Sequence, residues 1–224
     1  MKLNTIRTVL GVLVLGAIPA LADIAYIGQL QPGGNGLQAW QGSLGMTFTV
    51  NSAITVNDMG VYNWLGPTGA PLAAPLTVAI YNTSTGLIVN GTEFMFNAGQ
   101  AYAQLPGDSF DLFQQIKPVQ LAPGGYEVVA VGFGPNQFNG NQGFGNGAAG
   151  AAEGAPASVI KYTNGGFYSN DNGGTIVLPT IADGGPANRY DAGTFAFSTP
   201  EPGFYGVLAL GLAGLAVAVR RKRA

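Results

Sequence analysis

Two carboxylates that lie three positions apart, Asp108 and Asp111, have the best residue types for acid–base chemistry. A glycosidase needs two carboxyl groups that face each other across a cleft, one of them with a raised pKa. The segment Gly107-Asp108-Ser109 is instead typical of a turn in which the aspartate accepts backbone hydrogen bonds. The chain has no histidine and no cysteine, so Ser-His and Cys-His nucleophile pairs and thiolate metal ligands are excluded. We therefore expect a turn here, and a protein that is not an enzyme.

Two stretches place carboxylate and amide oxygens beside glycines, as calcium-binding loops do. They are residues 170–174 (Asn-Asp-Asn-Gly-Gly) and residues 183–185 (Asp-Gly-Gly). Neither stretch fits the EF-hand or nonapeptide pattern, and no glutamate follows at the required distance. Ordinary turns are the favoured interpretation, calcium is the alternative, and no cofactor is expected.

Six aromatic residues could include a surface on which a sugar ring stacks, with Asn, Gln and Asp completing the hydrogen bonds. They are Trp40, Tyr62, Trp64, Tyr81, Phe167 and Tyr168. Core packing is the favoured role for any single one of them. Trp64 is the exception, because Asn63-Trp64-Leu65-Gly66-Pro67 has the composition of a loop after a strand. It is our candidate ligand-binding residue.

At the N-terminal end of the chain, residues 1–22 have the layout of a secretory signal peptide. Lys2 and Arg7 precede an apolar stretch from Val9 to Ile18, and Ala20 and Ala22 form an A-x-A cleavage site. We expect signal peptidase to cleave after Ala22. An uncleaved N-terminal anchor is the alternative.

Residues 200–224 combine three features in a fixed order. Pro200, Glu201 and Pro202 form a short extended motif. The apolar run 203–219 would reach roughly 25 Å as a helix, near the lower limit for a single transmembrane span. A cytoplasmic basic stop follows, made of Arg220, Arg221, Lys222 and Arg223. On physical grounds alone, a simple membrane anchor with a proline linker also fits.

This order resembles the PEP-CTERM sorting signal of exported proteins in Gram-negative bacteria that make exopolysaccharide. In that family an exosortase, a membrane-embedded cysteine protease or transpeptidase, recognises the motif, and the tail is thought to be removed. The resemblance covers residues 200–224 only. It implies that Pro200, Glu201 and Pro202 are the recognition motif, that the inner membrane holds an intermediate, and that the protein reaches the cell surface or extracellular matrix.

The body, residues 23–199, has the length of one domain. It carries three Lys/Arg and ten Asp/Glu, which gives a formal charge of 3 − 10 = −7, whereas the whole chain has −2. An acidic body with three scattered cations is a poor nucleic-acid binder, so we expect no nucleic-acid partner.

The body shows the two-residue periodicity of strands, with β-branched and aromatic residues at alternate positions. Turn residues at 82–86 predict a hairpin over 76–89. The complete set of expected strands is 46–50, 54–57, 76–81, 87–89, 112–121, 126–133, 158–163, 175–178 and 193–198. This pattern predicts an all-β fold, an antiparallel β-sandwich of the jelly-roll or immunoglobulin-like kind.

The segment 132–156 is rich in Gly, Asn, Ala and Gln, and we expect a long mobile loop or a disordered insertion there. Phe133, Phe138 and Phe144 punctuate it. Anchoring of a low-complexity loop is the favoured role for these rings, and an aromatic binding loop is the alternative.

Residues 48–62, 78–88 and 121–131 resemble a β-sandwich domain of unknown function that is common in exported bacterial proteins. The matching features are the strand pattern F-x-V followed by I-T-V-x-x-x-G-V-Y, a V-x-I-Y strand, and an L-x-P-G-x-Y turn. That family implies a fold and no catalytic residues.

Taken together, the sequence predicts a non-enzymatic, exported protein of the cell envelope or extracellular matrix with a structural or adhesive role, associated with exopolysaccharide. A carbohydrate-binding module and a secreted glycan hydrolase are the alternatives.

Overall fold

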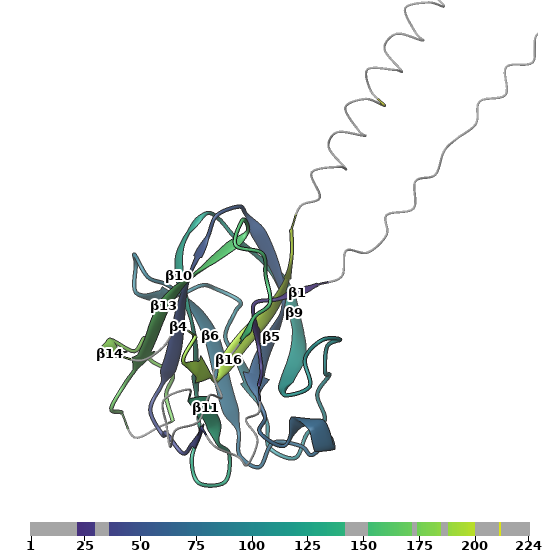
Figure 1. Ribbon diagram of the computed structural model, residues 1–224, viewed down its shortest axis with the longest axis vertical. Coiled ribbons are helices and arrows are strands. Elements are labelled where there is room, and N and C mark those ends of the chain that lie inside the picture. The colour runs from purple at the N-terminus through teal and green to yellow at the C-terminus, as the bar shows by residue number, and fades with distance from the viewer. Residues whose placement is uncertain are drawn as a thin grey trace, which may run out of the picture.

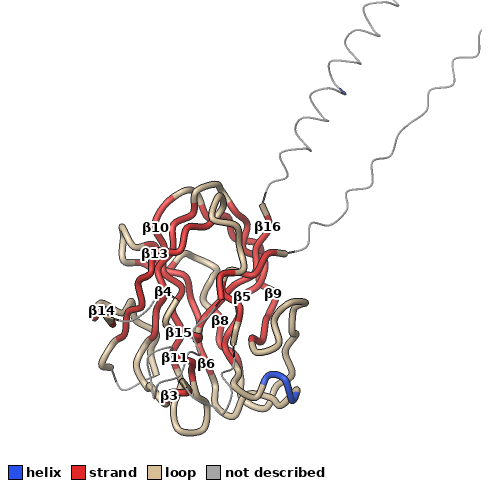
Figure 2. Tube along the Cα trace, viewed as in Figure 1, coloured by secondary structure: helices blue, strands red, loops and turns tan. Residues whose placement is uncertain are grey.

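The computed structural model describes residues 22–29, 36–141, 152–171, 174–184, 188–199 and Gly211. Between residues 22 and 199 the described chain consists of strands, loops and one short 3-10 helix, η2 (Gly66–Thr68), as Figure 2 shows. All strand pairings among the described residues are antiparallel. The prediction of an all-β, antiparallel fold is confirmed.

A four-stranded sheet forms one side of the body. Its strands, in spatial order, are β1 (Asp23–Ile24), β16 (Gly193–Ser198), β5 (Ile54–Tyr62) and β9 (Asp111–Leu121). The predicted strand at 193–198 has the observed bounds, and the strand expected at 54–57 continues to Tyr62.

A seven-stranded sheet forms the other side (Figure 1). Its main path runs through β14 (Ile181–Asp183), β13 (Ile160–Tyr168), β4 (Leu44–Val50), β10 (Gly124–Val131), β6 (Leu76–Asn82) and β7 (Leu87–Ile88), and β8 (Phe94–Phe96) also pairs with β6. Two small sheets complete the body: β15 (Tyr190–Asp191) with β11 (Asn139–Asn141) and β3 (Leu37–Gln38), and β12 (Ala152–Glu153) with β2 (Tyr26–Ile27).

The main core lies between the two large sheets, an arrangement consistent with a β-sandwich. Phe48 of β4 is stacked on Tyr126 of β10 and contacts Phe195 of β16 across the interface, with ring centroids 5.8 and 5.1 Å apart. Full burial of one such apolar side chain stabilises a fold by about 1.5–3 kcal/mol. Burial of alternate strand residues between the sheets therefore drives folding, as expected from the two-residue period of the sequence.

The two ends of the body lie side by side. Asp23 of β1 pairs with Phe197 of β16, and Ile24 pairs with Ala196 (Figure 1). The segment that follows β1 is also fixed to β16, because Thr194 Oγ1 accepts a hydrogen bond from Tyr26 N and donates one to Tyr26 O. The body thus begins and ends at one place on the smaller sheet.

A second, smaller core covers the outer face of the larger sheet. Ala79, Tyr81, Val129 and Val131 of the sheet are buried there with Ile176. The strand expected over 175–178 is absent, and this part of the prediction is wrong: residues 176–180 have no regular secondary structure and lie over the sheet. The apolar residues that suggested a strand serve as a cover instead.

The expectation of a mobile loop over 132–156 also needs correction where the structure describes it. Residues 139–141 form β11, which pairs with β3 and β15, and residues 152–153 form β12. Phe133 is buried in the core, and Phe138 packs edge-on against Trp64. Phe144 lies outside the described residues.

Buried amide side chains hold the described residues 137–141 of this segment in place. Gln137 Oε1 accepts a hydrogen bond from the backbone of Ala73 at 2.9 Å. Asn141 Nδ2 donates to Gln38 Oε1, also at 2.9 Å. Polar groups can be buried when such partners satisfy them, so composition alone does not indicate disorder.

Candidate functional site

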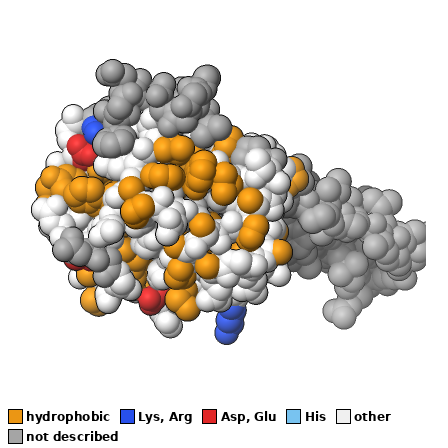
Figure 3. All heavy atoms as spheres, turned by 90° about the horizontal axis from the view of Figure 1, so that it is seen from below, with side chains coloured by type: hydrophobic (Ala, Val, Ile, Leu, Met, Phe, Trp, Pro, Cys, Tyr) orange, Lys and Arg blue, Asp and Glu red, His pale blue; other side chains and the backbone are white. Residues whose placement is uncertain are grey.

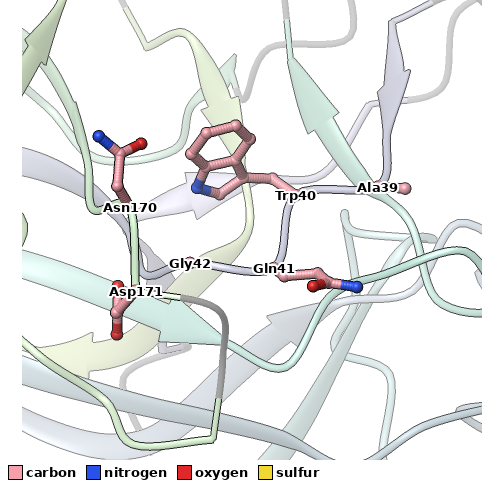
Figure 4. Close-up of a pocket in the computed structure, with 6 residues that line it drawn as sticks. All are labelled: Ala39, Trp40, Gln41, Gly42, Asn170 and Asp171. Atoms are coloured by element: carbon pink, nitrogen blue, oxygen red, sulfur yellow. The ribbon is translucent and has the colours of Figure 1, made fainter.

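The described part of the chain contains a polar hollow with one tryptophan on its wall. It has a volume of about 220 Å³. Figure 4 shows the residues that line it, which come from two segments: Ala39, Trp40, Gln41 and Gly42 after β3, and Asn170 and Asp171 after β13. Trp40 and three polar residues line the hollow, with Asn170 and Asp171 on one side of Trp40 and the Gln41 side chain extending to the other.

Both the indole ring and the backbone of Trp40 donate hydrogen bonds that fix its position. Its indole Nε1 donates to Ser169 O at 3.1 Å, and its backbone N donates to Asn139 Oδ1 at 3.4 Å. The ring packs edge-on against Tyr168, with the ring centroids 5.3 Å apart. Trp40 is half-buried: it packs against the main core and also lines the hollow.

The two segments that form the hollow are joined by further hydrogen bonds around Ser43. Ser43 N donates to Ser169 Oγ at 2.7 Å, and Ser169 N donates to Ser43 O at 3.0 Å. Ser43 Oγ accepts from Val177 N at 3.1 Å. Asp171 accepts a hydrogen bond from the Ser169 hydroxyl. Backbone and side-chain hydrogen bonds therefore fix the walls of the hollow.

Gly42 permits this close approach. A Cβ at this position would collide with the carbonyl oxygen of Ser169 and lie 2.9 Å from Trp40 Nε1. Only glycine allows the two backbones to pack so tightly here.

Trp64, the ligand-binding candidate from the sequence, lies elsewhere. It follows β5, is half-buried, and contacts Phe138 with ring centroids 5.5 Å apart. Its Nε1 is buried without a hydrogen-bond partner among the described residues. The structure therefore places Trp64 apart from the hollow and orients its polar atom inward.

Asp108 and Asp111 form a buried clamp on the N-terminal segment. Asp108 Oδ1 accepts from the backbone of Phe110 and Asp111, each at 2.9 Å, which is the predicted Asx turn. Asp108 Oδ2 and Asp111 Oδ2 both accept from Gly28 N, at 3.0 and 2.9 Å. Neither carboxyl faces a cleft, since Asp108 is 5% and Asp111 1% exposed.

A third carboxyl extends this clamp. Asp191 Oδ2 accepts from Gln29 N at 2.7 Å. Burial raises the pKa of Asp111 well above its usual range, and the adjacent Asp108 charge adds to the rise. Burial also raises the pKa of Asp191. The hydroxyl of Tyr62 is buried nearby, and burial together with the three carboxylates raises its pKa.

The two calcium-loop candidates engage protein groups. Asp171 accepts from Ser169, as described above, and Asp183 forms a salt bridge to Arg189 of 2.9 Å and accepts from Tyr190 OH at 2.6 Å. Within the described ranges, no group of three or more acidic, His or Cys residues is arranged to hold a metal ion. Residues 172–173 and 185 lie outside those ranges.

Charged groups are sparse on the surface. Figure 3 shows a face on which hydrophobic and neutral polar side chains predominate and few charges appear. The hollow follows the same pattern, because its lining contains a single acidic residue, Asp171, and no basic one. The arrangement suits a neutral polar ligand better than an anion.

No protein-family model matches the chain, and no curated protein shows significant sequence similarity to it. The described part of the chain contains no helix that is long and apolar enough to span a membrane. Four features predicted from the sequence lie outside that part: the sorting motif, the basic stop, the apolar run 203–219 and the signal-peptide site. Two of their residues, Gly211 and Ala22, are described.

The sequence predictions include Trp40 within a group of six aromatics and place Asn170 and Asp171 in a candidate calcium loop, but they give Gln41 no role. The available signal was the sequence Trp40-Gln41-Gly42, which is separated from the start of β4 by Ser43 alone. The partner segment is 129 residues away along the chain, as the bond from Trp40 to Ser169 shows, so only the pairing of β4 with β13 brings the two together.

Proposed function

We propose that this chain is an exported cell-envelope or extracellular-matrix protein of a Gram-negative bacterium, sorted by a PEP-CTERM signal. The observation that carries the proposal is the order of features in residues 200–224: Pro-Glu-Pro, an apolar run and a basic cluster. Signal peptidase and an exosortase are its processing enzymes. The inner membrane holds a transient intermediate, and the cell surface or matrix is the destination.

The arrangement of the body supports this proposal. β1 begins at Asp23, the residue after the proposed signal-peptidase site, and β16 ends at Ser198, two residues before Pro200. Because these strands pair with each other, both membrane-directed segments leave the body from the same place. A chain attached to one membrane at both ends can therefore fold without separating its two attachment points.

The role proposed at the destination is structural or adhesive, without catalysis, and in association with exopolysaccharide. A body of formal charge −7 with three basic residues, and a surface of mostly neutral groups, suit such a matrix. We include in the proposal the jelly-roll or immunoglobulin-like class of sandwich. The hydrolase alternative gains no support from Asp108 and Asp111, because both are buried in hydrogen bonds to backbone amides.

A carbohydrate-binding module is the second candidate function. The Trp40 hollow favours it, since one aromatic ring and several amide and carboxylate groups line a small open space there. The two proposals are compatible, because the first concerns the route of the protein and the second concerns a ligand.

The sorting proposal is tested by following the protein in its own host. The double variant Pro200→Ala/Pro202→Ala should accumulate in the inner membrane with its tail attached, whereas wild type should leave that fraction. Pro71→Ala, at an exposed loop position of the body, is the matched control and should behave as wild type. Equal surface delivery of wild type and the double variant would contradict the proposal.

A further inference from the structure

The Trp40 hollow lies at the end of the body opposite the C-terminal end of β16. Strand β4 starts at Leu44, just after the hollow, and ends at Val50, where a short turn leads into β5. The start of β5 pairs with the end of β16, through Thr55 and Ser198. Seven residues of strand span roughly 20 Å. The hollow therefore faces away from the end at which the chain would be attached.

The chemistry of the lining selects a class of ligand. The face of an indole carries partial negative charge and attracts the electropositive C–H groups of a pyranose ring. Gln41 and Asn170 have exposed amide side chains that both donate and accept hydrogen bonds, as sugar hydroxyls require. Asp171 adds an acceptor and repels anions, and no basic residue lines the hollow.

The size of the hollow limits how much of the ligand it holds. Pockets for drug-sized ligands have volumes of about 300–1,000 Å³, and this one has about 220 Å³. One sugar unit of a longer chain fits that description better than an enclosed oligosaccharide. Preorganisation by the bonds of Trp40, Ser43 and Ser169 reduces the entropy lost on binding.

We infer that the hollow formed by Trp40, Gln41, Asn170 and Asp171 binds one neutral pyranose unit of a polysaccharide. The ring of the sugar stacks on Trp40, and its hydroxyls bond to the two amides and the carboxylate. The source of this ligand rests on the proposed delivery to an exopolysaccharide matrix. The site gives the body a glycan contact on the side away from the cell.

The two tryptophans of the chain make this inference directly measurable. In Trp64→Phe, Trp40 is the only indole, and its fluorescence reports on the hollow. We would titrate this variant with cellohexaose, mannohexaose and isomaltohexaose, and with hexagalacturonate as the anionic comparator. At least one neutral hexaose should change the Trp40 signal saturably with a Kd of roughly 1 mM or lower, and hexagalacturonate should not.

Two variants on the hollow test the assignment by calorimetry. Trp40→Ala should weaken binding of that hexaose by about tenfold or more, since it removes the stacking surface. Because Trp40 also packs against Tyr168, the variant Gln41→Ala/Asn170→Ala provides a second test that leaves the fold intact. It should weaken binding about threefold to tenfold through lost hydrogen bonds. Gln115→Ala, an exposed amide on β9, is the control and should bind as the parent does.

Three results would overturn the inference: no saturable signal with any neutral hexaose, binding of hexagalacturonate as tight as that of the neutral sugars, or binding unaffected by the variants of the hollow. Each is independent of sorting. If the protein reaches the surface but does not bind these sugars, the binding site is refuted and the proposed sorting route is unaffected. If the protein binds the sugars but stays in the inner membrane, the sorting route is refuted and the binding site is unaffected.

Discussion

Glu127 is buried on the outer face of the larger sheet, and its charge should make the fold sensitive to alkaline pH. Its side chain lies beside Gly45 and Pro179 and is 3% exposed. Its Oε1 has no hydrogen-bond partner among the described residues. Burial raises the pKa of Glu127 from 4.5 to about 8, because the charged carboxylate loses its hydration there.

The size and sign of the effect follow from this pKa. The folded protein retains the proton between pH 4.5 and about 8, while the unfolded chain releases it, so stability falls as the pH rises through this window. Below this pH window the stabilisation that depends on neutral Glu127 is fully present, and above the window it is lost. With about 1.4 kcal/mol for each pKa unit, the loss is on the order of 3–5 kcal/mol.

The substitution Glu127→Gln keeps the shape of the side chain and removes its charge. Urea unfolding, followed by tryptophan fluorescence at pH 5, 7 and 9, should give wild type and variant similar free energies of unfolding at pH 5. At pH 9 the variant should be more stable by roughly 3–5 kcal/mol. Asp111 and Asp191 titrate in the same direction in both proteins, so the difference isolates Glu127.

Glu93→Gln is the matched control, since Glu93 is exposed. It should change the free energy of unfolding by no more than about 0.5 kcal/mol at any of these pH values. If wild type and Glu127→Gln lose the same stability between pH 5 and pH 9, the reasoning about the buried charge is refuted.

Three other substitutions test the packing of the body. Asp108→Ala should lower the free energy of unfolding by about 1–3 kcal/mol, because the backbone amides of Phe110 and Asp111 lose their acceptor and Gly28 N keeps only Asp111; unchanged urea midpoints would count against the clamp. Phe48→Ala should cost about 3–5 kcal/mol through the cavity left between the sheets, and a loss below 1 kcal/mol in the same assay would contradict the core described above. Gly42→Ala should destabilise the protein by roughly 1–3 kcal/mol and disturb the indole environment in near-UV circular dichroism, since its methyl group would collide with Ser169; an unaltered spectrum would oppose that view.

The strands that could be predicted are those with local signals. The hairpin over 76–89 is confirmed, because Tyr81 pairs with Ile88 and Asn82 with Leu87. Asn82 Oδ1 accepts from Ser84 N and Thr85 N, and Gly86 adopts a positive φ of 69°. The alternation of residues and the turn chemistry both act within a few positions, so the sequence is sufficient to identify them.

The features that could not be predicted depend on distant partners. Strand β11 is ordered by Gln38, about a hundred positions earlier along the chain. Ile176 lies in an apolar stretch that resembles a strand. In the structure it packs on the outer face of the larger sheet and does not pair with a strand. The hollow likewise requires Trp40 and Ser169 to meet through the pairing of β4 with β13. Local sequence patterns do not indicate such long-range contacts.

The central claim is that the C-terminal segment is a sorting signal which is removed. The measurement that tests it most directly is intact-mass and C-terminal peptide mass spectrometry of the protein recovered from the cell surface and the medium. We predict a mature chain that starts at Asp23 and contains no residue beyond the Pro200–Pro202 region. Recovery of surface protein that still carries Arg223 would contradict it.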